Sequence, residues 1–158
     1  MTEDAAQKNA PHTDAVAPLT DAEEQWVQDR LGFARQEGVD HLEPDQVSAY
    51  ADRQLAAVQA GELEPEVASV MLDVVAVLLG EHLGAAHGLQ WVTVRDDDGT
   101  HLGLRDPFSS AVVFPQSTVG THWNEGATGW VPQFVEWFGG QGRQAVSYTH
   151  LRAPATDS

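Results

Sequence analysis

Three side chains that can bind a metal ion lie close together at the end of an apolar segment. Glu81, His82 and His87 offer one carboxylate and two imidazoles, which are the ligands of metal-assisted hydrolases. The two histidines are five residues apart, about 140° around a helix, and the order of residues matches neither H-E-x-x-H nor H-x-x-E-H. A metal site therefore needs a further ligand, such as His101 or His122. Polar residues at a helix end, where histidine suits the helix dipole, are the simpler interpretation.

A second constellation depends on the register of a hairpin. Two runs with alternating apolar residues flank the sequence Asp96-Asp97-Asp98-Gly99, which predicts antiparallel strands joined by a turn. We expect a three-residue loop, Asp97 to Gly99, with Gly99 in the left-handed conformation. A loop of two or four residues would instead set the valines opposite His101 and Gly103. The three-residue loop places four aliphatic side chains on one face: Val92, Val94, Leu102 and Leu104.

The opposite face of this hairpin is the binding site that the sequence favours. In the expected register it carries Trp91, Arg95, His101 and Arg105, a basic and aromatic group in an acidic chain. Arginine can bind a carboxylate through two hydrogen bonds, and tryptophan can cover an apolar or cationic group. We therefore expect a small acidic ligand or an acidic side chain of a partner here. The alternative is that helices cover this face and the arginines pair internally.

Composition limits the partners and the chemistry. The chain has 158 residues, of which 42% are hydrophobic, enough for one compact domain with a real core. Its formal net charge of −16 disfavours nucleic acids and anionic membranes, because both are bound through lysine and arginine. A basic protein would be attracted, although a solubilising surface also explains the charge. The absence of cysteine excludes disulfides, thiolate nucleophiles and cysteine-type zinc sites.

The two ends of the chain and its longest apolar run predict a cytoplasmic protein. Residues 1–19 lack both the positive charge and the apolar core of a signal peptide, and we expect them to be a disordered leader. The apolar run Val67 to Leu79 is shorter than the roughly 20 residues that span a bilayer. We therefore expect no membrane contact.

Three helices are predicted in the N-terminal half. The first begins at Thr20, which forms a capping box with Glu23, and ends near residue 38. The second runs over 44–61, and the third begins at residue 65; both have proline at the first helical position. The third is apolar on nearly all sides, so we expect it to be the central helix on which the sheet packs.

The C-terminal half completes an α+β fold. We expect a third strand over 111–115 and a short last helix. The predicted fold is three N-terminal helices packed on a small three-stranded antiparallel sheet, plus a short C-terminal aromatic helix, in a single domain over 20–138. Residues 139–158 are expected to be a linker and tail. The aromatic stripe of the last helix is Trp130, Phe134, Trp137 and Phe138, which we expect to be core.

The end of the tail has an unusual sequence. Residues 146–153, VSYTHLRA, resemble a peptide that recurs when sequencing-adapter read-through is translated. We therefore expect residues 146–158 to be non-native and exclude them from fold reasoning.

The central block also resembles a known bacterial family, domain of unknown function 3806. The matching features are the glycine-interrupted helix LLGEHLG, the segment HGLQWVTVRDDDGTHLGL and the strand that ends in Phe114-Pro115. The resemblance covers about residues 70–116. After Pro115 the family continues with a strand and a Lys-Arg pair, whereas this chain has Gln116 to Gly120 and no such pair. The family implies a fold and no known activity.

These observations favour a non-enzymatic module that binds a protein or a ligand and neutralises a basic partner. No serine has a base beside it in the sequence, so we assign no catalytic residue and expect no cofactor. The alternative is a small metal-assisted hydrolase that uses Glu81, His82 and His87. A third hypothesis is a homodimer formed through the tryptophan-rich C-terminal region.

Overall fold

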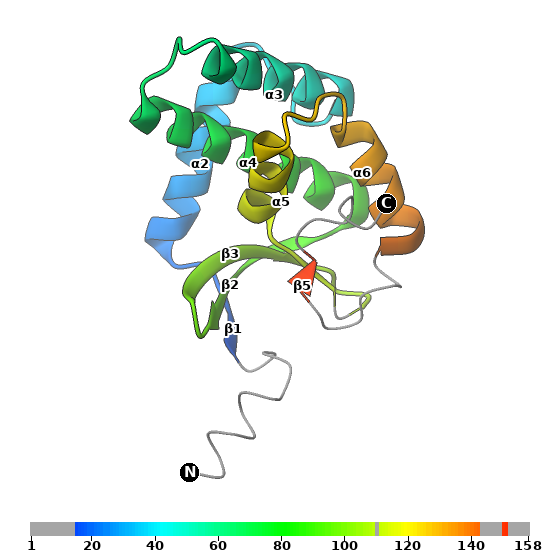
Figure 1. Cartoon of the computed structure of the whole chain (residues 1–158). Coiled ribbons are helices and arrows are strands. Elements are labelled where there is room, and N and C mark those ends of the chain that lie inside the picture. Colours follow the sequence, from blue (N-terminus) through cyan, green and yellow to red (C-terminus); the bar gives the residue numbers. More distant parts are fainter. Residues whose placement is uncertain (1–14, 110, 143–149, 152–158) are drawn as a thin grey trace.

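The computed structural model has an α+β architecture with its helices on one side of a single sheet (Figure 1). It describes residues 15–109, 111–142 and 150–151. The helices are α2 (Asp21–Gln36), α3 (Pro44–Gln59), α4 (Pro65–His87), α5 (Pro115–Asn124) and α6 (Val131–Trp137), and a π-helical turn (Phe138–Gly142) follows. The strands, which lie in sequence order across the sheet, are β1 (Val16–Pro18), β2 (Gln90–Asp96), β3 (Gly99–Arg105), β4 (Val112–Val113) and β5 (His150–Leu151).

The sheet is larger than the three strands expected from the sequence. The pairs from β1 to β4 are antiparallel, and β5 pairs with β4 in parallel. Strand β1 belongs to the segment 1–19 that was expected to be a leader; it pairs with β2, while residues 1–14 lie outside the described part. Strand β5 lies within residues 146–158, and the rest of that segment is outside the described residues.

Helix α5 was not expected, because Pro115 was interpreted as the end of a strand. Proline lacks the N–H that the first helical turn leaves unbonded, so it suits the first position of a helix. Pro115 has this role in α5, as Pro44 does in α3 and Pro65 in α4. The sequence signal is the same in all three helices, but at Pro115 it follows closely on a strand of only two residues.

The N-terminal helices and the aromatic last helix confirm the expected order of elements. Thr20 caps α2: its Oγ1 accepts from the Glu23 backbone N–H at 3.1 Å, and the Thr20 N–H donates to Glu23 Oε1 at 2.8 Å. Helix α6 contains Phe134 and Trp137 of the predicted stripe, with Trp130 just before it and Phe138 just after it, and Trp130, Phe134 and Phe138 are buried. The C-terminal tryptophans therefore contribute to the core of this chain.

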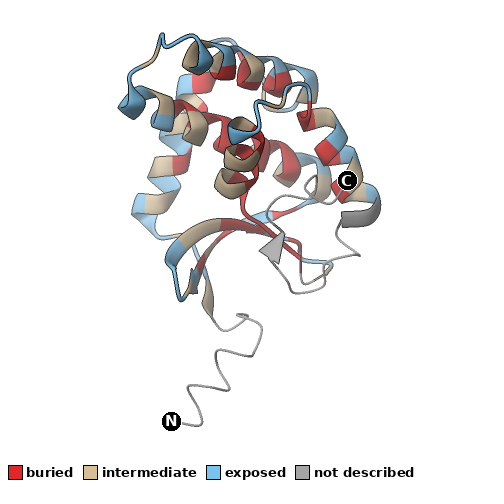
Figure 2. Cartoon of the chain, in the orientation of Figure 1, coloured by how far each residue is buried: buried red, intermediate tan, exposed pale blue. Residues whose placement is uncertain are grey.

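Helix α4 is the centre of the core, as its apolar sequence predicts. Ten of its residues are buried, and it contacts α2, α3, α5 and β2 (Figure 2). By length and composition alone, α4 could span a bilayer. Half of its most apolar stretch of 18 residues, however, is buried within the protein. A central core helix has the same properties.

The sheet is attached to α4 through Trp91. The Trp91 indole lies where a side chain on Gly80 would be: a Cβ at Gly80 would overlap Cζ2 of the Trp91 ring. The Trp91 Nε1–H donates to Glu81 Oε2 at 2.8 Å, so one helical turn supplies both the space for the ring and an acceptor for its polar group. The glycine of the LLGEHLG motif is therefore required by packing.

The hairpin register differs from the predicted one by one residue. The loop has two residues, Asp97 and Asp98, since Asp96 pairs with Gly99. Asp96 Oδ1 accepts from the Asp98 N–H at 2.8 Å, which stabilises the turn through the side chain. Gly99 has the positive φ expected for it, 124°, a conformation that L side chains rarely adopt.

The reason for this register is that both faces of the hairpin bury apolar groups. The face toward the helices takes Trp91, Leu102 and Leu104. The other face buries a separate cluster of Val92, Val94, Val112 and Phe114, with Val16 packed against it. Gly103 has a role in this cluster, because a Cβ there would lie 3.0 Å from Val112 Cγ1 and 3.4 Å from Phe114 Cε1. The prediction assumed that only one face was apolar.

The fit between Gly80 and Trp91 can be tested with one methyl group. We expect Gly80→Ala to displace the indole and to lower the free energy of unfolding by about 1–3 kcal/mol. Gly32→Ala in α2 is the matched control: nothing lies within 4 Å of the new Cβ, so the variant should gain roughly 0.5–1 kcal/mol. Urea denaturation measures both. Equal effects of the two substitutions would contradict the packing role of Gly80.

Tyr50 gives a test at alkaline pH. It is fully buried, with its O–H donating to Met71 Sδ at 3.7 Å. Burial, followed by the negative charge of Glu37, raises the pKa of the phenol to about 12 from 10.0. Unfolded tyrosine ionises first, so stability should fall as the pH rises from about 10 to about 12.

The expected titration is measured in a Tyr148→Phe variant, in which Tyr50 is the only tyrosine. The phenolate absorbance of the folded variant should rise near pH 12, together with loss of circular dichroism, and near pH 10 in urea. Ionisation of the folded variant near pH 10 with unchanged circular dichroism would refute the burial argument. Tyr50→Phe should lose this part of the alkaline destabilisation.

Candidate functional site

The four residues of the predicted binding face do not lie together. In the observed register Trp91 and Arg95 are on the face toward the helices, and His101 and Arg105 are on the opposite face. Trp91 is further engaged by Glu81. The prediction that Arg95 and Arg105 lie on one face and bind one acidic group together is therefore wrong. Neither Arg95 nor Arg105 forms a salt bridge with a carboxylate of the described residues, so internal pairing is not observed either.

The three candidate metal ligands point to different parts of the structure. Glu81 accepts from Trp91, His82 Nδ1 donates to the His41 carbonyl at 3.0 Å, and His87 Nε2 donates to the Val135 carbonyl at 3.3 Å. His82 is buried and connects α4 to the turn before α3. Each of the three side chains therefore joins α4 to another segment of the chain.

The further ligands that the metal hypothesis needed are also engaged elsewhere. His122 is buried, donates from Nδ1 to the Thr118 carbonyl at 2.9 Å and stacks on Trp130 with ring centroids 4.0 Å apart. His101 Nε2 donates to Asp96 Oδ1 at 3.0 Å. Across the described ranges, no group of three or more histidine, aspartate and glutamate side chains is arranged to hold a metal ion.

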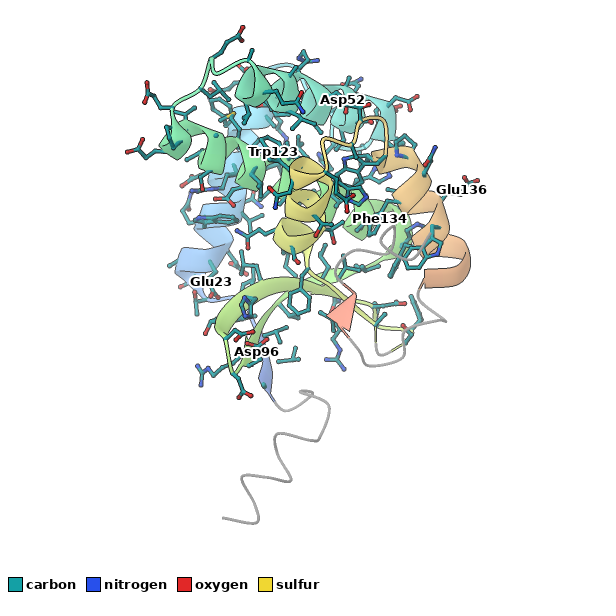
Figure 3. All side chains as sticks on the ribbon, in the orientation of Figure 1. Glu23, Asp52, Asp96, Trp123, Phe134 and Glu136 are labelled. Carbon is teal, nitrogen blue, oxygen red and sulfur yellow. The ribbon has the colours of Figure 1, made fainter. Side chains whose placement is uncertain are left out.

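The candidate site is an open groove of about 410 Å³ between α2, β3 and the start of α5. Figure 3 shows Glu23 at the end of α2 that lies next to the hairpin, whose tip carries Asp96. The walls of the groove are mainly apolar with a few polar groups, as is common for binding sites. They are formed by Ala22, Glu23 and Trp26 of α2, Thr100, His101 and Leu102 of β3, and Gln116 of α5.

Glu23 is the charged centre of this groove. One oxygen, Oε1, accepts from the Thr20 N–H at 2.8 Å and from the Thr93 hydroxyl at 2.8 Å, so the capping residue of α2 also binds the sheet. The bond from the Thr20 backbone, followed by that from Thr93, lowers the pKa of Glu23 from 4.5, which keeps the carboxylate ionised at neutral pH. No described residue hydrogen-bonds to the second oxygen, Oε2.

Gln116 and Trp26 complete the groove. The Gln116 amide donates through Nε2 to Asp73 Oδ1 at 2.9 Å, which fixes the amide and leaves its oxygen without a described partner. Trp26 already binds one cation: the Arg30 guanidinium lies over its ring, 4.1 Å from the centroid. Ala22, one turn before Trp26, lines the groove, whereas Arg30, one turn after it, does not.

Two acidic segments flank the groove. The first turn of α2 carries Asp21, Glu23 and Glu24. The hairpin turn carries Asp96, Asp97 and Asp98. Negative charge on both sides of a partly apolar cleft concentrates the field there and attracts cations.

Sequence reasoning identified some groove residues but gave them other roles. Glu23 was recognised as part of a capping box, and His101 was expected on the hairpin binding face. Trp26, Leu102 and Gln116 come from three elements that only the fold brings together. No spacing in the sequence connects them, so no local pattern could have found this site.

Comparison with known proteins gives one match. The family model described as "Domain of unknown function (DUF3806)" matches residues 51–134, a little over half of the chain. Comparison with curated proteins and with solved structures found no match. The matched region contains Gly80, Glu81 and Trp91 and also the β3 and α5 walls of the groove, whereas the α2 wall lies before it.

The double role of Glu23 predicts an acid-dependent contribution to stability. Because its pKa is lowered from 4.5, the contribution is present above that pH and is lost as the pH falls through the folded-state value. We expect Glu23→Gln to lower the free energy of unfolding near neutral pH, by less than about 1 kcal/mol because the side chain is only partly buried. The difference from the wild type should shrink on acidification.

Urea denaturation at a series of pH values measures this difference. Glu24→Gln, on the same helical turn, is the control, because Glu24 is exposed. A Glu23→Gln effect that is constant down to strongly acid pH would show that the charge of Glu23 does not contribute.

Proposed function

Since the chain belongs to the DUF3806 family, which carries no described activity, we propose a function from the residues of this chain: a non-enzymatic module whose groove binds a basic side chain of a partner protein. The observation that carries this proposal is which polar groups in and next to the groove already have hydrogen-bond partners. The Gln116 amide nitrogen donates to Asp73, and the Thr93 hydroxyl, next to the groove, donates to Glu23. Two acceptors, Glu23 Oε2 and Gln116 Oε1, remain without a described partner.

A guanidinium group fits these acceptors better than an anion or a neutral acceptor does. It is planar, carries five N–H donors and stacks on aromatic rings. In the proposed complex it donates to Glu23 and packs its plane against Trp26 and Leu102. Arg30 over Trp26 is an internal example of the same contact. Charge-assisted hydrogen bonds of this kind are stronger than those between neutral groups.

The charge of the whole chain supports a basic protein as the source of that side chain. A formal net charge of −16 attracts a basic partner over a distance of about one Debye length, roughly 8 Å at physiological salt. The groove then supplies the short-range selectivity that charge alone lacks. A cytoplasmic location and a role in neutralising such a partner stay predictions.

The direct test is a titration with single side-chain probes. We expect N-acetylargininamide to shift the NMR signals of the Trp26 indole N–H and of the Gln116 side-chain amide, with a dissociation constant in the millimolar range. The citrulline analogue, a neutral isostere of arginine, should cause no such shifts. Glu23→Gln should weaken binding about tenfold, equivalent to about 1.4 kcal/mol for one charged contact.

Glu24→Gln is the matched control, because it removes the same charge from the same turn at a residue that does not line the groove. It should change binding much less than Glu23→Gln does. Equal effects of the two substitutions would reduce the interaction to general charge attraction. Equal binding of the citrulline analogue would refute recognition of the cation.

A further inference from the structure

The groove lies beside an incompletely paired strand edge. Strand β4 pairs with β3 only at Leu104 and Arg105, so in the described part of the chain residues 99–102 of β3 have β2 on one side and no strand on the other. No hydrogen bond joins the outward-facing main chain of these residues to any described group. The same residues form one wall of the groove through Thr100, His101 and Leu102.

The side chains of this edge do not protect it against pairing, and the start of α5 lies beside β3 across the groove. Proteins guard edge strands with lysine, proline, bulges or charged side chains. Residues 99–102 contain no acidic residue, lysine, arginine or proline. The edge strand on the other side of the sheet, β1, ends in Pro18. The stretch of β3 without these features is the one that borders the groove.

We propose that the partner of the groove is an extended peptide segment that adds a strand to β3 at residues 99–102 and places a basic side chain in the groove. This inference rests on the proposed function and specifies the form of the partner. Main-chain hydrogen bonds supply affinity in strand addition, and alternate side chains supply specificity. Four residues of edge span about 13 Å, enough for a strand of four or five residues.

The two faces of the hairpin determine the sequence pattern of the segment. The side chain over the helix-facing side meets Glu23, Trp26 and Gln116 and is therefore basic. Its neighbours point to the other face, where the His101 and Phe114 rings pack edge to face with centroids 6.1 Å apart. Apolar β-branched neighbours fit that surface and also favour an extended backbone. The expected motif is a basic residue flanked by two apolar residues.

The test compares three forms of one blocked pentapeptide, Thr-Val-Arg-Val-Thr. Neighbouring N–H groups of a strand point to opposite edges, so N-methylation of the two valines blocks one edge and N-methylation of the arginine and the last threonine blocks the other. We expect the parent peptide to bind at least about tenfold more tightly than N-acetylargininamide, which carries the same charge. One methylated form should lose this gain, and the other should keep it.

Amide hydrogen exchange gives an independent readout. The outward-facing amides within residues 99–102 should exchange more slowly in the presence of the parent peptide. N-acetylargininamide, which fills the groove without pairing to the edge, should leave their exchange rates unchanged. Glu23→Gln should weaken both probes by a similar factor.

The outcomes separate the two proposals. If N-acetylargininamide binds as proposed but both methylated peptides match the parent, strand addition is wrong and the basic-side-chain site stands. If neither N-acetylargininamide nor the parent peptide binds, the proposed function fails and this inference fails with it. Strand addition would also be wrong if both methylated peptides bound no more tightly than N-acetylargininamide and the parent peptide left amide exchange within residues 99–102 unchanged.

Discussion

The contact between Gly80 and the Trp91 indole fixes how the sheet and the helices meet. Because helix α4 has no side chain at Gly80, the ring can lie against the helix, and Glu81 on the same turn bonds its N–H. Trp91 then sets which face of β2 points to the helices. Thr93, two residues on, lies on the same face and reaches Glu23. The position of α2 on the hairpin, and with it the groove, follows from this contact.

The polar groups around the groove have both structural and recognition roles. Glu23 caps its own helix, binds the sheet through one oxygen and leaves the other oxygen for the groove. Gln116 is fixed in the same way by Asp73, an acidic residue within the apolar core helix. A hydrogen bond within the protein that already holds the accepting side chain reduces the conformational entropy lost when a ligand binds. A site built in this way needs few residues of its own.

The hairpin shows where inference from a single sequence fails. Alternation of apolar residues determines that two strands form, but choosing a register requires knowing which face is buried. Here both faces are buried, and Gly103 serves the second face by making room for Phe114. The cluster that covers that face includes Val112 and Val16 from β4 and β1. Neither contact is visible in the local pattern of the hairpin, and the four predicted binding residues were separated as a consequence.

The sequence by itself determined the features that depend on neighbouring residues. These are the Thr20 capping box, the proline helix starts, the apolar central helix and the aromatic last helix. Tertiary structure decided the number of strands, the hairpin register and the composition of the groove. These features depend on contacts between segments far apart in the chain, such as Thr93 with Glu23 or Asp73 with Gln116. Local propensity has a short range, whereas burial of a face is a property of everything packed against it.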